Sequence, residues 1–303
     1  MKNKLPDFLI VGAAKSGTSS MHYYLNQHPK IFMPTYTSSG LKVKEPRFLI
    51  ADKLKNRVSK GIWDFKSYNE LFQDAEDGQI TGESTVLYLF YYKEAIPNIK
   101  RYLGENTKII IMLRNPIDRA YSAYLFSSRT NQENNKFEQA LKMNFDLYKS
   151  NKLLSPMILY KELGLYYDMV KAYFDHFKDV HIVIYDDFKK DPKIEISRVL
   201  SFLNIRDNVE IDSEKIVNKG GKQWNSDLIK QIFMSNSLIK KFLRLILSKK
   251  SRRILYNLLT SFFVQKAPPV SYKIKKQLLQ YYIKDIEKLE KIINKDLSKW
   301  KEI

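Results

Sequence analysis

Short apolar runs alternate with longer amphipathic segments along most of this chain. Residues 8–11, 108–113 and 180–185 form short, mostly apolar stretches rich in β-branched side chains, which predicts buried strands. Residues 80–85 predict a further strand that breaks into a loop. Because strands alternate with helical patterns, we expect an α/β fold with a central, mostly parallel sheet flanked by helices.

Helical spacing of apolar residues is found in the remaining segments. The amphipathic stretches that predict helices are residues 18–25, 63–72, 93–103, 117–126, 159–177 and 192–203. Pro46 and Pro116 would suit the first turn of a helix, and residues 127–155 look irregular, with one helix starting at Phe137. We expect a single domain over residues 1–303, with a basic helical segment at about 235–266 and a C-terminal helix at 271–300 packed on it.

The loop after the first predicted strand suits a phosphate. Residues 12–17 are small and allow a sharp turn, and the next helix begins at Thr18. Free backbone N–H groups, the helix dipole and the charge of Lys15 would all attract an anion there. A nucleoside triphosphate P-loop places its Lys after the second Gly, whereas Lys15 precedes Gly17. An ordinary strand–loop–helix with a solvated Lys is the alternative.

A second anion site is predicted after residues 108–113. Arg114 follows this strand directly, Pro116 opens the next helix and Ser122 lies two turns into it. The planar guanidinium of an Arg can take two phosphate oxygens. No carboxylate ends the strand, so the Mg²⁺ ligand of a nucleotide hydrolase is missing at this position. Helix capping by Arg114 and plain exposure of Ser122 are the alternatives.

Composition adds limits to these expectations. The chain has 303 residues and a net charge of +19, which favours polyanionic partners. It has no Cys, and its four His are scattered, so neither a thiolate site nor a metal cluster is predicted. No secretory signal or spanning apolar run is visible, so we expect a cytoplasmic protein, with the inner face of the membrane as an alternative location.

The two anion motifs together resemble the sulfotransferases that use 3′-phosphoadenosine 5′-phosphosulfate. The similar segments are the Lys15-Ser16-Gly17-Thr18 loop, the stretch from Leu113 to Ser122, Gly82-Glu83-Ser84-Thr85 with Tyr88, Gly164-x-Tyr166 on an expected helix, Asp186-Asp187, residues 218–222 and the closing helix with Trp300. The resemblance covers nearly the whole chain. It implies a P-loop-like three-layer fold and sulfuryl transfer without a metal.

The resemblance also implies a set of donor-binding residues. Lys15 would neutralise the leaving bridge oxygen, and the 5′-phosphate would lie on the loop and first helical turn. Arg114 and Ser122 would hold the 3′-phosphate. The full expected set is Lys15, Ser16, Gly17, Thr18, Ser19, Arg114 and Ser122, with Lys219, Gly220, Gly221 and Lys222 of a late loop folding over the cosubstrate.

A general base is still needed for a hydroxyl or amine acceptor. Glu45, in the Glu-Pro-x-Phe setting of the glycan-modifying members, is the first choice, and Glu83 is the rival. Lys44 could assist the sulfuryl group or a carboxylated acceptor, while Glu83 could instead bind a sugar hydroxyl. The alternative is that Glu45 only forms a surface salt bridge with Lys44 or Arg47.

The expected partners are the nucleotide cosubstrate and a carbohydrate, glycolipid or other hydroxyl acceptor, without nucleic acid. Residues 235–265 hold seven Lys or Arg and no acidic residue, so peripheral contact with an anionic membrane is an alternative to packing on the domain. Two other functions stay open: a P-loop kinase or nucleotide hydrolase, and a non-catalytic binder of polyanions or membranes. The sequence does not identify the acceptor.

Overall fold

The computed structural model describes residues 4–37, 40–130, 132–142, 145–206, 209–214, 217, 220–226, 230–231, 248, 251, 254 and 262–303. A five-stranded sheet forms the centre, in the order β2-β3-β1-β4-β5. Every pairing in it is parallel. Its strands are β1 (Phe8–Gly12), β2 (Ile31–Phe32), β3 (Ile80–Ser84), β4 (Lys108–Leu113) and β5 (Val180–Ile184). The predicted parallel sheet is therefore confirmed.

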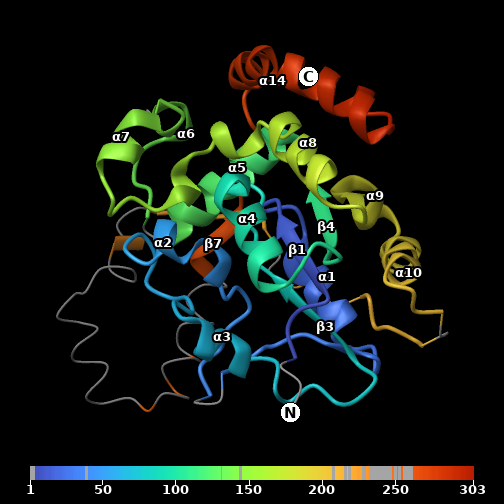
Figure 1. Cartoon of the computed structure of the whole chain (residues 1–303). Coiled ribbons are helices and arrows are strands. Elements are labelled where there is room, and N and C mark those ends of the chain that lie inside the picture. The colour runs from blue at the N-terminus through green and yellow to red at the C-terminus, as the bar shows by residue number, and fades with distance from the viewer. Residues whose placement is uncertain are drawn as a thin grey trace.

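Helices cover both faces of the sheet, as Figure 1 shows. Alternate strand residues point to opposite faces. Phe8 and Ile10 of β1 face a core with α1 (Thr18–Leu25) and α10 (Pro192–Phe202), whereas Leu9 and Val11 face the larger core. That core packs against α4 (Tyr92–Tyr102), α5 (Pro116–Arg129) and α8 (Tyr167–His176). The result is the three-layer arrangement that the sequence predicts.

The shorter elements connect or extend these layers. They are η1 (Phe48–Ile50), α2 (Ala51–Leu54), α3 (Phe65–Glu70), α6 (Phe137–Ala140), α7 (Phe145–Ser150), η2 (Pro156–Ile158), η3 (Glu162–Gly164), α9 (Tyr185–Lys190) and η4 (Ser298–Lys301). The C-terminal helix α14 (Tyr272–Ile293) contacts α8 and α5 and lies at the end of the molecule marked C in Figure 1. The expected closing helix is thus present, although it ends at Ile293.

One predicted helix is wrong over its first half. Residues 159–177 were expected to form one helix, but α8 begins only at Tyr167. The carbonyl of Tyr160 accepts hydrogen bonds from buried Arg119 and from the Tyr282 hydroxyl, which also donates to the carbonyl of Lys161. These carbonyls serve tertiary contacts, so the chain turns there instead of continuing a helix. Tyr166 of the Gly164-x-Tyr166 motif consequently caps α8 and does not lie inside a helix.

Three smaller expectations also differ from the structure. Pro46 does not open a helix, because Arg47 adopts a left-handed conformation (φ 64°) and η1 begins after it. Tyr185 starts α9 instead of ending β5, and Glu83 lies within β3 instead of in a loop.

The basic segment at about 235–266 falls mostly outside the described residues. Its last part, β7 (Val264–Lys266), is a strand that pairs antiparallel with β6 (Lys222–Trp224), where the sequence predicted helix. Among the residues that the structure describes, no helix is long and apolar enough to cross a membrane.

The strand order places β1 between β3 and β4. The chain leaves β1 toward β2 and β3 on one side and later returns to β4 on the other. In open parallel sheets, ligands bind at such a switch point, outside the carboxyl ends of the strands. The loops after β1, β3 and β4 all start at this edge. The fold therefore directs attention to the residues that follow these three strands.

Candidate functional site

The loop between β1 and α1 (residues 13–17), called the phosphate loop below because the sequence predicts an anion there, lies at the carboxyl end of β1. Gly17 has φ 89°, and a Cβ there would lie 3.0 Å from the ring of Tyr185, so the position requires glycine. Ser16 is fully buried, and its Oγ has no hydrogen-bond partner among the described residues. The N–H of Ser20 donates to the Gly17 carbonyl at 2.9 Å, whereas the N–H groups of Thr18 and Ser19, the first two of α1, have no acceptor within the helix. The loop can therefore donate several hydrogen bonds to one anion.

Lys15 brings a cation to this loop. It adopts a left-handed conformation (φ 70°), and its Nζ lies 4.3 Å from the centre of the Phe126 ring on α5. Burial, together with the charges of Arg129 and Arg114, lowers the pKa of Lys15 from 10.5 to about 8. An ammonium held beside two guanidinium groups is stabilised when a multiply charged anion binds between them.

Arg114 follows β4, as predicted, and reaches the phosphate loop. Its Nη1 donates to the carbonyl of Lys15 at 3.2 Å, and its guanidinium carbon lies 4.6 Å from the centre of the Tyr185 ring. Its buried Nε has no partner among the described residues. The backbone carbonyl of Arg114 accepts a 3.0 Å hydrogen bond from the Tyr166 hydroxyl. The hydrogen bond from Tyr166 thus holds the backbone of Arg114 at the point where the chain leaves β4.

Ser122 and the late loop meet on the same side of α5. A Cβ built on Gly220 would lie 3.6 Å from the Ser122 Oγ, so the loop backbone passes close to this hydroxyl. Gly221 has φ 75°, and its carbonyl accepts from the N–H of Ala267, while Lys222 begins β6 and is exposed. Lys219 lies outside the described residues. Three of the four predicted late-loop residues can thus be placed.

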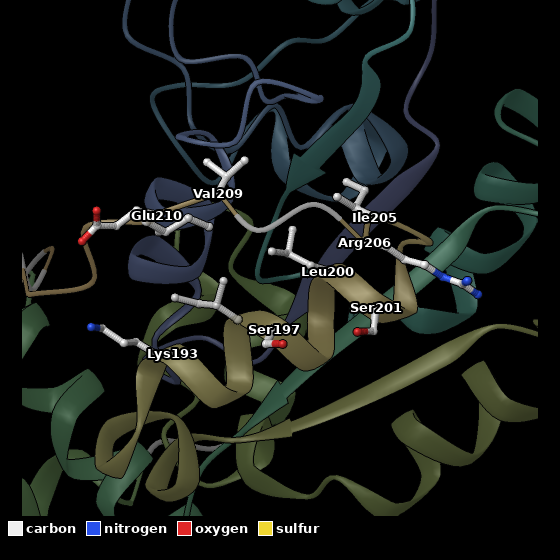
Figure 2. Close-up of a pocket in the computed structure, with 10 residues that line it drawn as sticks. Lys193, Ser197, Leu200, Ser201, Ile205, Arg206, Val209 and Glu210 are labelled. Carbon is white, nitrogen blue, oxygen red and sulfur yellow. The ribbon is translucent and has the colours of Figure 1, made fainter.

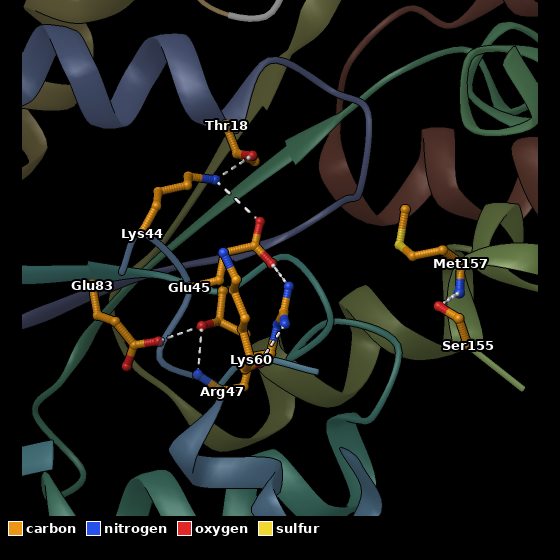
Figure 3. A network of polar contacts seen from close by, with 9 residues as sticks. Thr18, Lys44, Glu45, Arg47, Lys60, Glu83, Ser155 and Met157 are labelled. Atoms are coloured by element: carbon orange, nitrogen blue, oxygen red, sulfur yellow. Dashed lines mark hydrogen bonds and ion pairs between the residues drawn. The ribbon is translucent and has the colours of Figure 1, made fainter. Parts of the chain in front are cut away.

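The segment between β2 and η1 brings Lys44 and Glu45 to the phosphate loop. The Lys44 Nζ donates to the Thr18 Oγ1 at 3.2 Å and lies 3.4 Å from the Glu45 Oε1 (Figure 3). Arg47 Nη2 lies 3.2 Å from the Glu45 Oε2. Glu45 therefore lies between two cations, and its side chain keeps 20% of its surface accessible. Ser19, the last predicted residue of the first turn, follows Thr18 in α1.

The surrounding charges determine the protonation states of Lys44 and Glu45. Burial by itself raises the pKa of Glu45, but the charges of Lys44 and Arg47 hold it below its ordinary value. Burial lowers the pKa of Lys44, and the charge of Glu45 partly opposes this shift. Glu45 is therefore an ionised carboxylate at neutral pH, which is the form that can accept a proton.

Glu83 is close to this cluster but has no accessible surface. Its carboxylate accepts hydrogen bonds from the hydroxyls of Tyr68 and Thr85, both at 2.5 Å, and of Tyr88 at 3.2 Å. Burial raises the pKa of Glu83 to about 7. The structure thus gives the two candidate bases different surroundings: Glu45 borders the loop surface and Glu83 lies beneath it.

Sequence reasoning predicted Ser122 but missed Phe126 and Arg129 on the same face of α5. Ser122, Phe126 and Arg129 are spaced by four and three residues, so they lie on one face of the helix. This face carries the Lys15 contact at Phe126, and the indole N–H of Trp224 on β6 donates to the Arg129 carbonyl at 3.2 Å. The spacing was visible in the sequence, but nothing there indicated that Lys15 would lie against it.

Other features of the described residues lie apart from this cluster. A surface pocket of about 510 Å³ is lined by α10 and the residues after it, including Ser197, Leu200 and Val209 (Figure 2). None of its lining residues belongs to the phosphate loop or to the Glu45 segment. No group of three His, Asp or Glu suitable for a metal ion is found in the described part of the chain.

Comparison with known proteins identifies a family model and a solved structure that are similar to this chain. Residues 5–255 match the family model of the sulfotransferase domain. The crystal structure of a sulfotransferase from Alicyclobacillus acidocaldarius superposes with a TM-score of 0.71, at 26% identity, over 98% of this chain and 99% of that chain.

Two curated relatives are similar over shorter regions. The human heparan sulfate glucosamine 3-O-sulfotransferase 3B1 is 27% identical over 67% of this chain and 47% of the relative. The membrane-associated sulfotransferase kil1 of Dictyostelium discoideum is 30% identical over 41% of this chain and 23% of the relative. The matches thus span less than half the length of these two proteins. The family model covers most of the chain, and we conclude that the chain belongs to the sulfotransferase family.

Proposed function

We propose that this protein transfers a sulfuryl group from 3′-phosphoadenosine 5′-phosphosulfate to a hydroxyl or amine of a carbohydrate-like acceptor. The observation that carries the proposal is the grouping of Lys15 and Arg114, which face one phosphate loop, with the ionised Glu45 beside them. A donor with phosphate groups at two ends of its ribose needs two anion sites. Ser16 Oγ and Arg114 Nε are buried polar atoms without partners in the described structure, so the loop has donors to offer such a ligand.

When bound, the donor supplies the activated sulfur, whose bond to the bridging oxygen breaks as the acceptor oxygen attacks. Lys15 and the N–H groups of the loop hold the 5′-phosphate side and stabilise the growing negative charge on the leaving phosphate. Arg114 and Ser122 hold the 3′-phosphate, with Gly220 and Gly221 allowing the late loop to approach. We expect the cations of the protein to support the transfer by stabilising the negative charge on the leaving phosphate.

Glu45 takes the proton that the acceptor loses. Its carboxylate is ionised because Lys44 and Arg47 flank it, and its surface is partly accessible to an acceptor. Lys44 also contacts Thr18, so a bound phosphosulfate would compete with Glu45 for this ammonium. If Lys44 turns toward the donor, the pKa of Glu45 rises and the carboxylate becomes a stronger base. The carbohydrate acceptor is supported by the human relative, which is a heparan sulfate glucosamine 3-O-sulfotransferase.

The experiment compares two nucleotides and then tests transfer. Adenosine 3′,5′-bisphosphate should raise the melting temperature, whereas ATP with Mg²⁺ should raise it less, because Lys15 precedes Gly17 and β4 ends without a carboxylate. Donor labelled with ³⁵S should then modify one member of a panel of heparosan, chondroitin, a neutral glycolipid and 4-nitrophenol. Stronger stabilisation by ATP with Mg²⁺ would favour a kinase and overturn the proposal.

A further inference from the structure

Glu83 is the centre of a hydrogen-bond network that reaches the Glu45 segment. The hydroxyls that donate to it have further roles. Thr85 Oγ1 also accepts from the backbone N–H of Arg47 at 3.2 Å, and Tyr88 Oη accepts from the N–H of Leu49 at 3.3 Å. Two separate paths therefore lead from one buried carboxylate on β3 to two backbone N–H groups that follow Glu45.

The chemistry of a carboxylate gives these paths a direction. Above its pKa of about 7, Glu83 is an ionised carboxylate that only accepts hydrogen bonds, so in this form Thr85 and Tyr88 each turn their single hydroxyl hydrogen toward it. The lone pairs of both hydroxyls then face the N–H groups of Arg47 and Leu49. A group that could also donate, such as an amide, would leave this orientation undetermined.

The segment whose N–H groups donate these hydrogen bonds has a backbone conformation that needs support. Arg47 has φ 64°, a conformation that costs free energy for a residue with a side chain. In this conformation its guanidinium meets the Oε2 of Glu45 at 3.2 Å and the carbonyl of Lys60 at 2.6 Å, as Figure 3 shows. A change of the Arg47 backbone would therefore move the cation that holds Glu45.

We propose that Glu83 is a positioning residue, which orients Thr85 and Tyr88 so that they hold the backbone of Arg47 and Leu49 and thereby fix the Glu45 carboxylate at the phosphate loop. The proposal rests on the proposed function in one respect, namely that Glu45 acts as the base. Glu83 has no accessible surface, so it acts through these hydroxyls and not by touching the acceptor.

The first test measures amide hydrogen exchange of residues 45–50 in the protein without ligands. Thr85→Val removes one hydroxyl while keeping the shape of the side chain, and Tyr88→Phe removes the other. We expect exchange at Arg47 to be about tenfold faster in the Thr85 variant, and exchange at Leu49 to be similarly faster in the Tyr88 variant. Thr85→Ser keeps a hydroxyl and should restore protection.

Tyr68→Phe provides the matched control. The Tyr68 hydroxyl donates to the same Glu83 oxygen as Tyr88 but contacts no N–H of the 45–50 segment in the described structure. Its loss should leave exchange at Arg47 and Leu49 within about twofold of the wild type. Glu83→Gln, which can donate, should accelerate exchange at both positions. Unchanged exchange in Glu83→Gln, or equal acceleration in Tyr68→Phe, would overturn the proposal.

The second test is kinetic and uses heparosan as the acceptor. We expect Thr85→Val and Glu83→Gln to lower kcat about tenfold or more while the KM for the donor stays within about twofold, because the phosphate loop is not altered. Thr85→Ser and Tyr68→Phe should keep the wild-type kcat. A donor KM that rises in parallel with the loss of kcat would overturn the positioning role.

The exchange test needs neither donor nor acceptor. If wild-type protein does not sulfate heparosan while the exchange pattern appears as expected, the acceptor part of the proposed function fails and the positioning role of Glu83 stands. If the wild type is active but exchange at Arg47 and Leu49 is unchanged in Glu83→Gln, the positioning role of Glu83 fails and the proposed function stands.

Discussion

Lys15 is held in a position that costs stability in the absence of an anion. Burial and the neighbouring charges of Arg129 and Arg114 lower its pKa from 10.5 to about 8. In the unfolded chain this Lys keeps its ordinary pKa, so between pH 8 and 10.5 the unfolded state binds more protons than the folded state. The free energy of unfolding must therefore rise with pH in this window, and the penalty is complete below pH 8.

The magnitude follows from the shift. About 2.5 pKa units at ~1.4 kcal/mol each correspond to about 3 kcal/mol of destabilisation at pH 7. The cation–π contact between the Lys15 ammonium and the Phe126 ring, 4.3 Å from the ring centre, offsets about 1 kcal/mol of this destabilisation. Lys15→Met keeps the length of the side chain and removes the charge. We expect this variant to be more stable than the wild type by about 2 kcal/mol at pH 7.

Urea unfolding of wild type and Lys15→Met at pH 7 and pH 10 measures this difference. The advantage of the variant should fall to below ~1 kcal/mol at pH 10, where the wild-type Lys is neutral in the folded protein but still largely protonated in the unfolded chain. Lys276→Met, on the exposed face of α14, is the matched control and should change stability little at either pH. Adenosine 3′,5′-bisphosphate should stabilise the wild type and Lys276→Met but not Lys15→Met. The reasoning would be refuted if Lys15→Met were less stable than the wild type at pH 7. It would also be refuted if the stability advantage of the variant were as large at pH 10 as at pH 7.

Three further predictions concern other groups. Glu45→Gln should bind adenosine 3′,5′-bisphosphate as the wild type does but lose on the order of 10²-fold or more in turnover, measured with labelled donor; normal turnover would exclude Glu45 as the base. Arg114→Lys should reduce the preference for adenosine 3′,5′-bisphosphate over adenosine 5′-phosphate about tenfold, measured by titration calorimetry, since the ammonium cannot form two parallel bonds. Burial lowers the pKa of His22 to about 3, so acidification from pH 6.5 to 4.5 should cost the wild type about 2 kcal/mol in urea unfolding, and His22→Leu should lose that much less.

The sequence was most informative where one physical demand dominates. Runs such as residues 108–113 are buried on both faces of a parallel sheet, so their apolar character identifies them directly, and β4 has those bounds. The Lys15 loop and Arg114 were also predictable, because the carboxyl ends of parallel strands share one edge. Their meeting through a hydrogen bond from Arg114 to the Lys15 carbonyl follows from the order β1-β4 in the sheet.

The sequence failed where distant residues decide a backbone conformation. Residues 159–166 have the apolar spacing of a helix, but Arg119 and Tyr282 take two of the carbonyls that a helix would use. Arg47 adopts a left-handed conformation, and its N–H donates to Thr85 on the loop after β3. Local propensity carries no information on either contact, since the partners are separated by 38 residues or more.

The candidate bases show why a residue's type and motif are not enough to assign its role. Glu45 and Glu83 are both carboxylates near the same loop, and the sequence could not choose between them. Two cations lower the pKa of Glu45 and part of its surface stays accessible, whereas three hydroxyls surround Glu83 in a fully buried position. The first arrangement suits a group that exchanges a proton with a ligand, and the second suits a group that orders its neighbours. Both carboxylates can therefore serve one reaction, Glu45 at its surface and Glu83 in the support beneath it.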